Sequence, residues 1–118
     1  MFFGDVMGRA GRSAIINELQ NLRSKNGADF VIINAENASS GLGLSSQHAI
    51  DIFISGADCI TLGDHAFDQK DMMQFIEKEP RIIRPLNYAK SAPGKGATIL
   101  AIREADKFWF HKFSVKYL

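Results

Sequence analysis

Short apolar runs alternate with helical patterns along the chain. Four such apolar runs predict strands buried on both faces of a parallel sheet. They read "MFFGD", "DFVIINAEN", "ADCITLGDH" and "RIIRPL", at residues 1–5, 29–37, 57–65 and 81–86. Strand and helix follow each other repeatedly, which predicts parallel strands joined by right-handed crossovers. The expected fold class is therefore α/β, based on a parallel sheet.

Three amphipathic segments fill the gaps, at residues 12–27, 45–56 and 68–80. We expect the first helix to end at Gly27, the second to begin at capping serines and end at Gly56, and the third to be capped by Asp68 and to end at Pro80. The apolar spacing predicts one buried stripe on each helix. The predicted core side chains are Ile15, Ile16, Leu19, Leu22, Ile50, Phe53, Ile54, Met72, Met73, Phe75 and Ile76.

Polar side chains follow three of the four predicted strands. Asp5 ends the first, Glu36 and Asn37 end the second, and Asp64 and His65 end the third. The carboxyl ends of parallel strands meet at one edge of the sheet, where open α/β folds bind their ligands. These residues are far apart in sequence, but we expect them to converge in space.

Three carboxylates brought together without a counter-charge repel one another and raise each other's pKa values. Proteins usually resolve such a cluster with a divalent cation, because carboxylate oxygens are hard ligands. A donor set that adds an amide oxygen and an imidazole suits Mn, Fe or Zn better than calcium. A pair of metals bridged by a carboxylate activates water and neutralises a phosphate. The alternative is structural: Asp5 in a strand-to-helix turn, Glu36-Asn37 opening a loop, and Asp64 capping a short turn.

Bulk properties narrow the function classes. A chain of 118 residues suits one domain, and a net charge of +1 gives no electrostatic case for a nucleic-acid or membrane partner. The single cysteine, Cys59, cannot form an internal disulfide, which agrees with the cytoplasmic location that we expect. His48 is interpreted as a surface or half-buried helix residue, and Arg12 and Lys95 as solvated loop cations.

Four stretches, "FFGDVMGRAGR", "VIINAENASSGLG", "ADCITLGDHAFDQKD" and "IIRPLNYAKSAPGKG", occur in this order along the chain. Together they resemble the bacterial calcineurin-like metallophosphoesterases of the 2′,3′-cyclic-nucleotide 2′-phosphodiesterase type. The resemblance runs over residues 1–102 and covers well under half of a typical family member. Residues 103–118 form a divergent tail, so the chain resembles a single N-terminal portion, residues 1–118, of an α/β/β/α sandwich.

The resemblance implies hydrolysis of a small phosphodiester or cyclic nucleotide by water activated at two divalent metal ions, Fe or Mn foremost and Zn or Mg as alternatives. Asp5 resembles the aspartate ligand of the first motif, Glu36 the carboxylate that bridges both metals, and Asn37 the amide ligand beside it. Asp64 stands where the family has a ligating asparagine, and its extra negative charge weakens the pull of the metal on water. His65 resembles the catalytic histidine that orients the phosphate.

The family takes further histidine ligands from its C-terminal half, and nothing in the surroundings of His111 resembles such a motif. We therefore expect activity to be impaired in this truncated chain. The alternative function is a non-catalytic remnant that binds metal or nucleotide and self-associates as a homo-oligomer through its open sheet. In that case the tail aromatics, among them Trp109, would cover the exposed core. A flavodoxin-like nucleotide binder remains a third possibility, based on the Gly-rich first loop.

Overall fold

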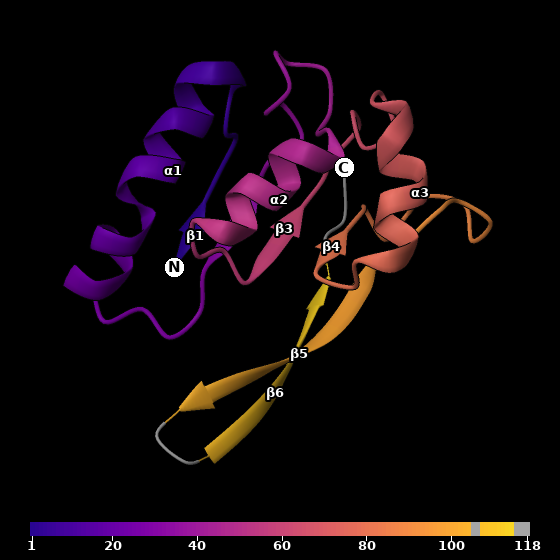
Figure 1. The fold of residues 1–118 in the computed structure, drawn as a ribbon. Coiled ribbons are helices and arrows are strands. Elements are labelled where there is room, and N and C mark those ends of the chain that lie inside the picture. The colour runs from indigo at the N-terminus through magenta and orange to yellow at the C-terminus, as the bar shows by residue number, and fades with distance from the viewer. Residues whose placement is uncertain (105–106, 115–118) are drawn as a thin grey trace.

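A parallel sheet of four strands, in the order β1-β2-β3-β4, lies at the centre of the fold (Figure 1). The computed structural model describes residues 1–104 and 107–114, with side chains through residue 101. The strands are β1 (Phe2–Phe3), β2 (Ile32–Asn34), β3 (Cys59–Thr61) and β4 (Ile82–Ile83). Each lies within a predicted apolar run, and all three strand pairs are parallel, so the predicted α/β class is confirmed.

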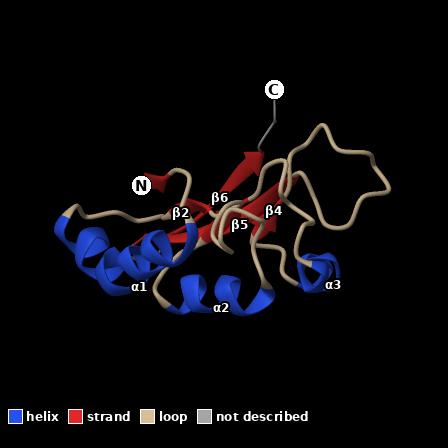
Figure 2. Ribbon diagram, turned by 90° about the horizontal axis from the view of Figure 1, so that it is seen from above, coloured by secondary structure: helices blue, strands red, loops and turns tan. Residues whose placement is uncertain are grey.

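The helices α1 (Gly8–Lys25), α2 (Ser46–Ile54) and α3 (Lys70–Lys78) occupy the three crossovers. Figure 2 shows them side by side on one face of the sheet. Helix α1 begins four residues before the predicted start, because the chain continues helically through Gly11. A Cβ at Gly11 would lie 3.2 Å from Val6, so glycine lets the first turn of α1 approach the end of β1 closely.

The core lies between this helical layer and the sheet. Ile15 and Leu19 of α1 and Met72 and Ile76 of α3 are buried as predicted. Helix α2 instead buries Ala49 and Ile52, a pair that the predicted stripe does not include. The other predicted core residues are partly or largely solvated: Leu22, Phe53 and Phe75 are half-buried, and Ile16, Ile50, Ile54 and Met73 are exposed.

The orientation of α2 follows from its neighbours. A fully buried alanine lets the helix backbone sit close to the sheet, and the contacts with α1 and α3 on either side fix its rotation. Periodicity alone cannot distinguish a face that contacts the sheet from an apolar flank. The predicted burial of Ile50 and Ile54 is therefore wrong, although the predicted cap is confirmed: Ser45 Oγ accepts a hydrogen bond from the His48 amide.

A long antiparallel hairpin follows the parallel sheet. Strands β5 (Ala97–Glu104) and β6 (Lys107–Ser114) pair in a register that sets Ala97 opposite Ser114. The hairpin extends away from the helices (Figure 1), and the segment that leads into it joins the sheet through a parallel bridge between Ile83 and Lys95. The hairpin does not follow from the periodicity above. The predictions for His111 and the tail aromatics concern side chains outside the described part of the chain.

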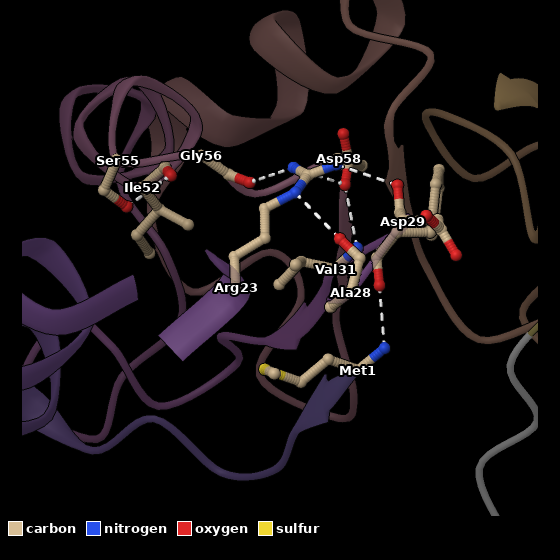
Figure 3. Close-up of polar contacts among 10 residues, drawn as sticks. Met1, Arg23, Ala28, Asp29, Val31, Ile52, Ser55, Gly56 and Asp58 are labelled. Atoms are coloured by element: carbon tan, nitrogen blue, oxygen red, sulfur yellow. Dashed lines mark hydrogen bonds and ion pairs between the residues drawn. The ribbon is translucent and has the colours of Figure 1, made fainter. Parts of the chain in front are cut away.

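Arg23 ties together the amino ends of the strands (Figure 3). Its guanidinium donates to the carbonyls of Ala28, Asp29 and Gly56 at 3.1, 2.8 and 2.9 Å, and pairs with Asp58 at 2.9 Å. Asp58 in turn accepts from the Val31 amide at 2.8 Å. One side chain of α1 thus fixes the loops that lead into β2 and β3. Within the part of the chain that is described, no helix is long and apolar enough to cross a membrane.

Candidate functional site

The residues predicted as ligands follow the carboxyl ends of β1, β2 and β3. These strands are adjacent and parallel, with Phe3 opposite Ile33 and Asn34 opposite Thr61. Asp5, Glu36 and Asp64 each lie two or three residues beyond the last strand residue, so the sheet delivers them to one edge. Asp5 takes a left-handed backbone conformation, with a φ of 49°, which turns the chain sharply from β1 toward α1.

Asp5 and Asn37 form the first pair at this edge. The Asn37 side-chain amide donates to Asp5 Oδ1 at 2.6 Å, and the Gly8 amide donates to the Asn37 carbonyl at 2.9 Å. Beside Asp5 a mainly apolar hollow of about 460 Å³ opens between β1 and the first turns of α1. This pair therefore joins the first and second strand ends next to a space large enough for a small organic group.

Glu36 and Asp64 form the second pair, and Gly63 makes it possible. A Cβ at position 63 would lie 1.8 Å from Glu36 Oε2, so the Glu36 carboxyl group occupies the space that any other residue would fill. Partial burial raises the pKa of Glu36, and a hydrogen bond and charge repulsion from Asp64 raise it further. The hydrogen bond from the Asn34 side-chain amide lowers this pKa in part. The two carboxyl groups are close enough to compete for one negative charge.

His65 continues this second pair outward. Its Nδ1 lies 2.7 Å from Asp68 Oδ2, and its Nε2 lies 3.9 Å from Asp64 Oδ2. The hydrogen bond with Asp68 raises the pKa of His65, and the charges of Asp64, Asp68 and Glu36 act in the same direction. A carboxylate on Nδ1 fixes the orientation of the imidazole and favours its protonated form. Asp68 thus holds the His65 ring in place at the strand edge.

The prediction that Asp68 caps the third helix is wrong. The helix begins one residue later, with Gln69 at the N-cap and no side-chain cap hydrogen bond. The Asp68 carboxylate is occupied by His65, three residues before it. In the sequence, Asp68 lies three residues after His65. This spacing is compatible with a His–Asp pair, but an aspartate at this position is equally typical of a helix N-cap.

His48 is half-buried, as predicted, and its contacts are structural. Its Nδ1 lies 2.8 Å from Ser39 Oγ, which also accepts a hydrogen bond from the Ser45 amide at 3.0 Å. Burial lowers the pKa of His48, and the charge of Arg12 lowers it further. Arg12 donates to the Ala38 carbonyl, so it is tied to the loop rather than solvated. These residues hold the loop that follows Glu36 and Asn37.

The donor set fits a divalent cation chemically. Carboxylate and amide oxygens with one imidazole are ligands for Mn, Fe, Zn or Mg, and the raised pKa of Glu36 marks a place where a positive charge would be stabilising. The side chains nevertheless gather as two pairs. Among the described residues, no group of three or more His, Cys, Asp or Glu side chains is arranged to hold a metal ion. The metal-ligating and catalytic roles stay predictions.

The family emerges from comparison with known proteins. The YmdB-like protein family matches residues 1–114. The chain belongs to this family. The Bacillus subtilis protein named 2′,3′-cyclic-nucleotide 2′-phosphodiesterase is 41% identical over 98 residues, which are 83% of this chain and 37% of that protein. The resemblance drawn from the sequence motifs is thereby confirmed.

Two solved structures share the fold of this YmdB-like chain. A crystal structure described as a novel phosphatase from Mycoplasma pneumoniae matches with a TM-score of 0.79 and 39% identity, over 86% of this chain and 38% of that one. A hypothetical protein from Thermus thermophilus matches with a TM-score of 0.78 and 33% identity, over 92% and 41%. The chain therefore spans about two fifths of the length of these relatives, in agreement with the predicted coverage.

Proposed function

We propose that this chain carries the first half of a metal-dependent phosphodiesterase site, acting on a small phosphodiester such as a 2′,3′-cyclic nucleotide. The observation that carries the proposal is the approach of the Glu36 and Asp64 carboxyl groups from neighbouring strands, which Gly63 permits. Holding like charges close together is unfavourable unless a cation or a proton compensates them. The Bacillus subtilis relative is named for this reaction, which supports this substrate class.

The chain's own residues divide the work. Glu36, Asp64, Asp5 and Asn37 would hold divalent cations, with Fe or Mn expected foremost. When bound, such cations supply an activated water and neutralise the charge of the phosphate. His65, protonated and held by Asp68, donates a proton or hydrogen bond to the oxygen that leaves phosphorus. The apolar hollow beside Asp5 offers room for the organic part of the substrate.

A hydrolysis assay tests the proposal. The purified chain is incubated with Mn²⁺ and either bis-(p-nitrophenyl) phosphate or 2′,3′-cyclic AMP, and product release is compared with Glu36→Ala. We expect turnover that falls at least about a hundredfold in this variant, because a carboxylate that would hold the cations is removed. Glu18→Ala, which removes an exposed carboxylate from α1, is the matched control and should leave turnover unchanged. Equal rates in the wild type and Glu36→Ala would contradict the assignment.

A second candidate function is a metal-binding module without turnover. The pairing of the donors, Asp5 with Asn37 and Glu36 with Asp64, favours it, because each pair supplies only part of a metal site. Under this alternative the chain takes up Mn²⁺ in a Glu36-dependent manner and hydrolyses neither substrate. Calorimetric titration with Mn²⁺ beside the hydrolysis assay separates the two functions. Self-association of the chain stays a prediction, to be measured by sedimentation of the same samples.

A further inference from the structure

Tyr88 contacts the site from a segment that the ligand motifs do not include. It lies in the loop after β4, and its hydroxyl donates toward the Asp64 carbonyl at 3.0 Å and the Gly63 carbonyl at 3.2 Å. Its ring packs edge-to-face on Phe67, with the ring centroids 5.7 Å apart. The tyrosine thus touches the backbone of the turn that carries Asp64 and His65.

The loop that presents Tyr88 is itself fixed by a buried arginine. Arg84 is 5% exposed, and its guanidinium donates to four backbone carbonyls of this loop. The distances are 3.1 Å to Pro85, 3.4 Å to Ala89, 3.3 Å to Ala92 and 3.0 Å to Pro93. A buried guanidinium that donates to several carbonyls makes a loop rigid, because moving any carbonyl would leave a buried polar group without its hydrogen bond. Tyr88 is therefore presented from a rigid support.

The Glu36 carboxyl group also contacts this turn, because it fills the space beside Gly63. The Ala66 amide closes the turn by donating to the Gly63 carbonyl at 3.2 Å. The Gly63–His65 turn is therefore contacted by a carboxyl group from the end of β2 and by a hydroxyl group from the loop after β4. Removing either contact gives the Asp64 side chain a wider range of positions.

We propose that Tyr88 is a positioning residue for Asp64 and His65. Its hydroxyl anchors the backbone of the turn, so that the Asp64 carboxylate stays within reach of Glu36 and a cation meets preorganised donors. This inference rests on the proposed function, because it assigns Tyr88 to the same metal site. Residues that orient ligands through a second layer of hydrogen bonds typically change metal affinity by a factor of about 10–100 when they are replaced.

Tyr88→Phe tests the inference, since it removes the hydroxyl and keeps the ring on Phe67. Ser55→Ala is the matched control: Ser55 Oγ also donates to a backbone carbonyl, that of Ile52 at 2.7 Å. Ser55 lies at the carboxyl end of α2, near the contacts of Arg23 (Figure 3). Two quantities are measured on the ¹⁵N-labelled chain. They are Mn²⁺ affinity, by calorimetry, and the hydrogen-exchange rate of the Ala66 amide, by NMR without metal.

We expect Tyr88→Phe to weaken Mn²⁺ binding about tenfold. We also expect it to speed exchange at Ala66 about fivefold, which corresponds to one lost hydrogen bond of about 1 kcal/mol. Ser55→Ala should change neither quantity by more than about twofold, although both variants lose a similar hydrogen bond. Unchanged Mn²⁺ affinity in Tyr88→Phe overturns the positioning role. If the wild type binds no Mn²⁺, the proposed function is refuted, whereas the anchoring role of Tyr88 is still tested by exchange without metal. In that case an unchanged exchange rate of the Ala66 amide in Tyr88→Phe overturns the role of Tyr88.

Discussion

Replacing Gly63 with alanine tests how the strand edge is built. The added Cβ would lie 1.8 Å from Glu36 Oε2, 2.2 Å from Cδ and 2.4 Å from Oε1. An ordinary contact of 3.4 Å requires Oε2 to retreat by about 1.6 Å, the difference between 3.4 and 1.8. The backbone of Gly63 is outside the left-handed region, so the clash with this carboxyl group is the cost of the substitution.

The size of the effect follows from what can move. The Glu36 carboxyl group is the end of a flexible side chain, so the chain should still fold, with a loss of about 1–3 kcal/mol typical of overpacking. A displacement of about 1.6 Å far exceeds the precision that ligand sites need, about 0.5 Å. We therefore expect Gly63→Ala to weaken Mn²⁺ binding at least about tenfold. Urea unfolding measures the first effect, and calorimetric titration with Mn²⁺ measures the second.

Two controls make this prediction refutable. Gly4→Ala introduces the same methyl group next to another proposed ligand, but its Cβ would meet only Phe2, at 3.6 Å, so stability should change little. In the Glu36→Ala background, Gly63→Ala should cost less than about 0.5 kcal/mol, because the colliding group is gone. The reasoning is refuted if Gly63→Ala destabilises both backgrounds equally, or if it leaves Mn²⁺ affinity unchanged.

Two further predictions concern stability. Arg23→Met should lower the free energy of unfolding, measured by urea titration, by about 2 kcal/mol, because several hydrogen bonds of a partly exposed charge are lost. A loss below about 0.5 kcal/mol would contradict the stabilising role of Arg23. The lowered pKa of His48 favours its neutral form in the fold, so its contribution is complete above about pH 6.5 and is lost as pH falls toward the folded-state pKa. Stability measured between about pH 5 and 7.5 should therefore fall on acidification less steeply in His48→Asn than in the wild type, and parallel pH profiles would refute this.

The architecture could be predicted because the parallel sheet has a strong local signature in the sequence. Each strand is a β-branched or aromatic run followed by a polar residue, and helix boundaries carry markers such as Ser45 and Pro80. The rotation of α2 could not be predicted, since its apolar residues surround most of the helix and only tertiary contacts choose Ala49 and Ile52 as the buried pair. Hairpin β5–β6 lies largely in the segment interpreted as a divergent tail, where no familiar motif marks its strands.

The sequence predicted which residues lie at the site, but not the contacts that they make with one another and with their neighbours. Adjacent parallel strands explain why Asp5, Glu36 and Asp64 reach one edge, and that inference needs only the strand order. The role of Gly63 depends on a contact from the neighbouring strand, and that of Tyr88 on a loop held by a buried arginine. Neither contact leaves a periodic trace in the sequence. The partner of His65 was visible in the sequence, but local spacing supported a helix cap equally well.

The bonds made by Arg23 lie where the strands enter the sheet, whereas the ionisable groups lie where the strands leave it. The stabilising contacts and the candidate ligands therefore lie at opposite ends of the strands. Substitutions that change the ligands at the carboxyl ends leave the stabilising contacts of Arg23 at the amino ends intact. A mutational library confined to the exposed positions Asp5 and Asp64 should consequently yield mostly folded variants, and this makes the chain a practical starting point for directed evolution of hydrolytic sites.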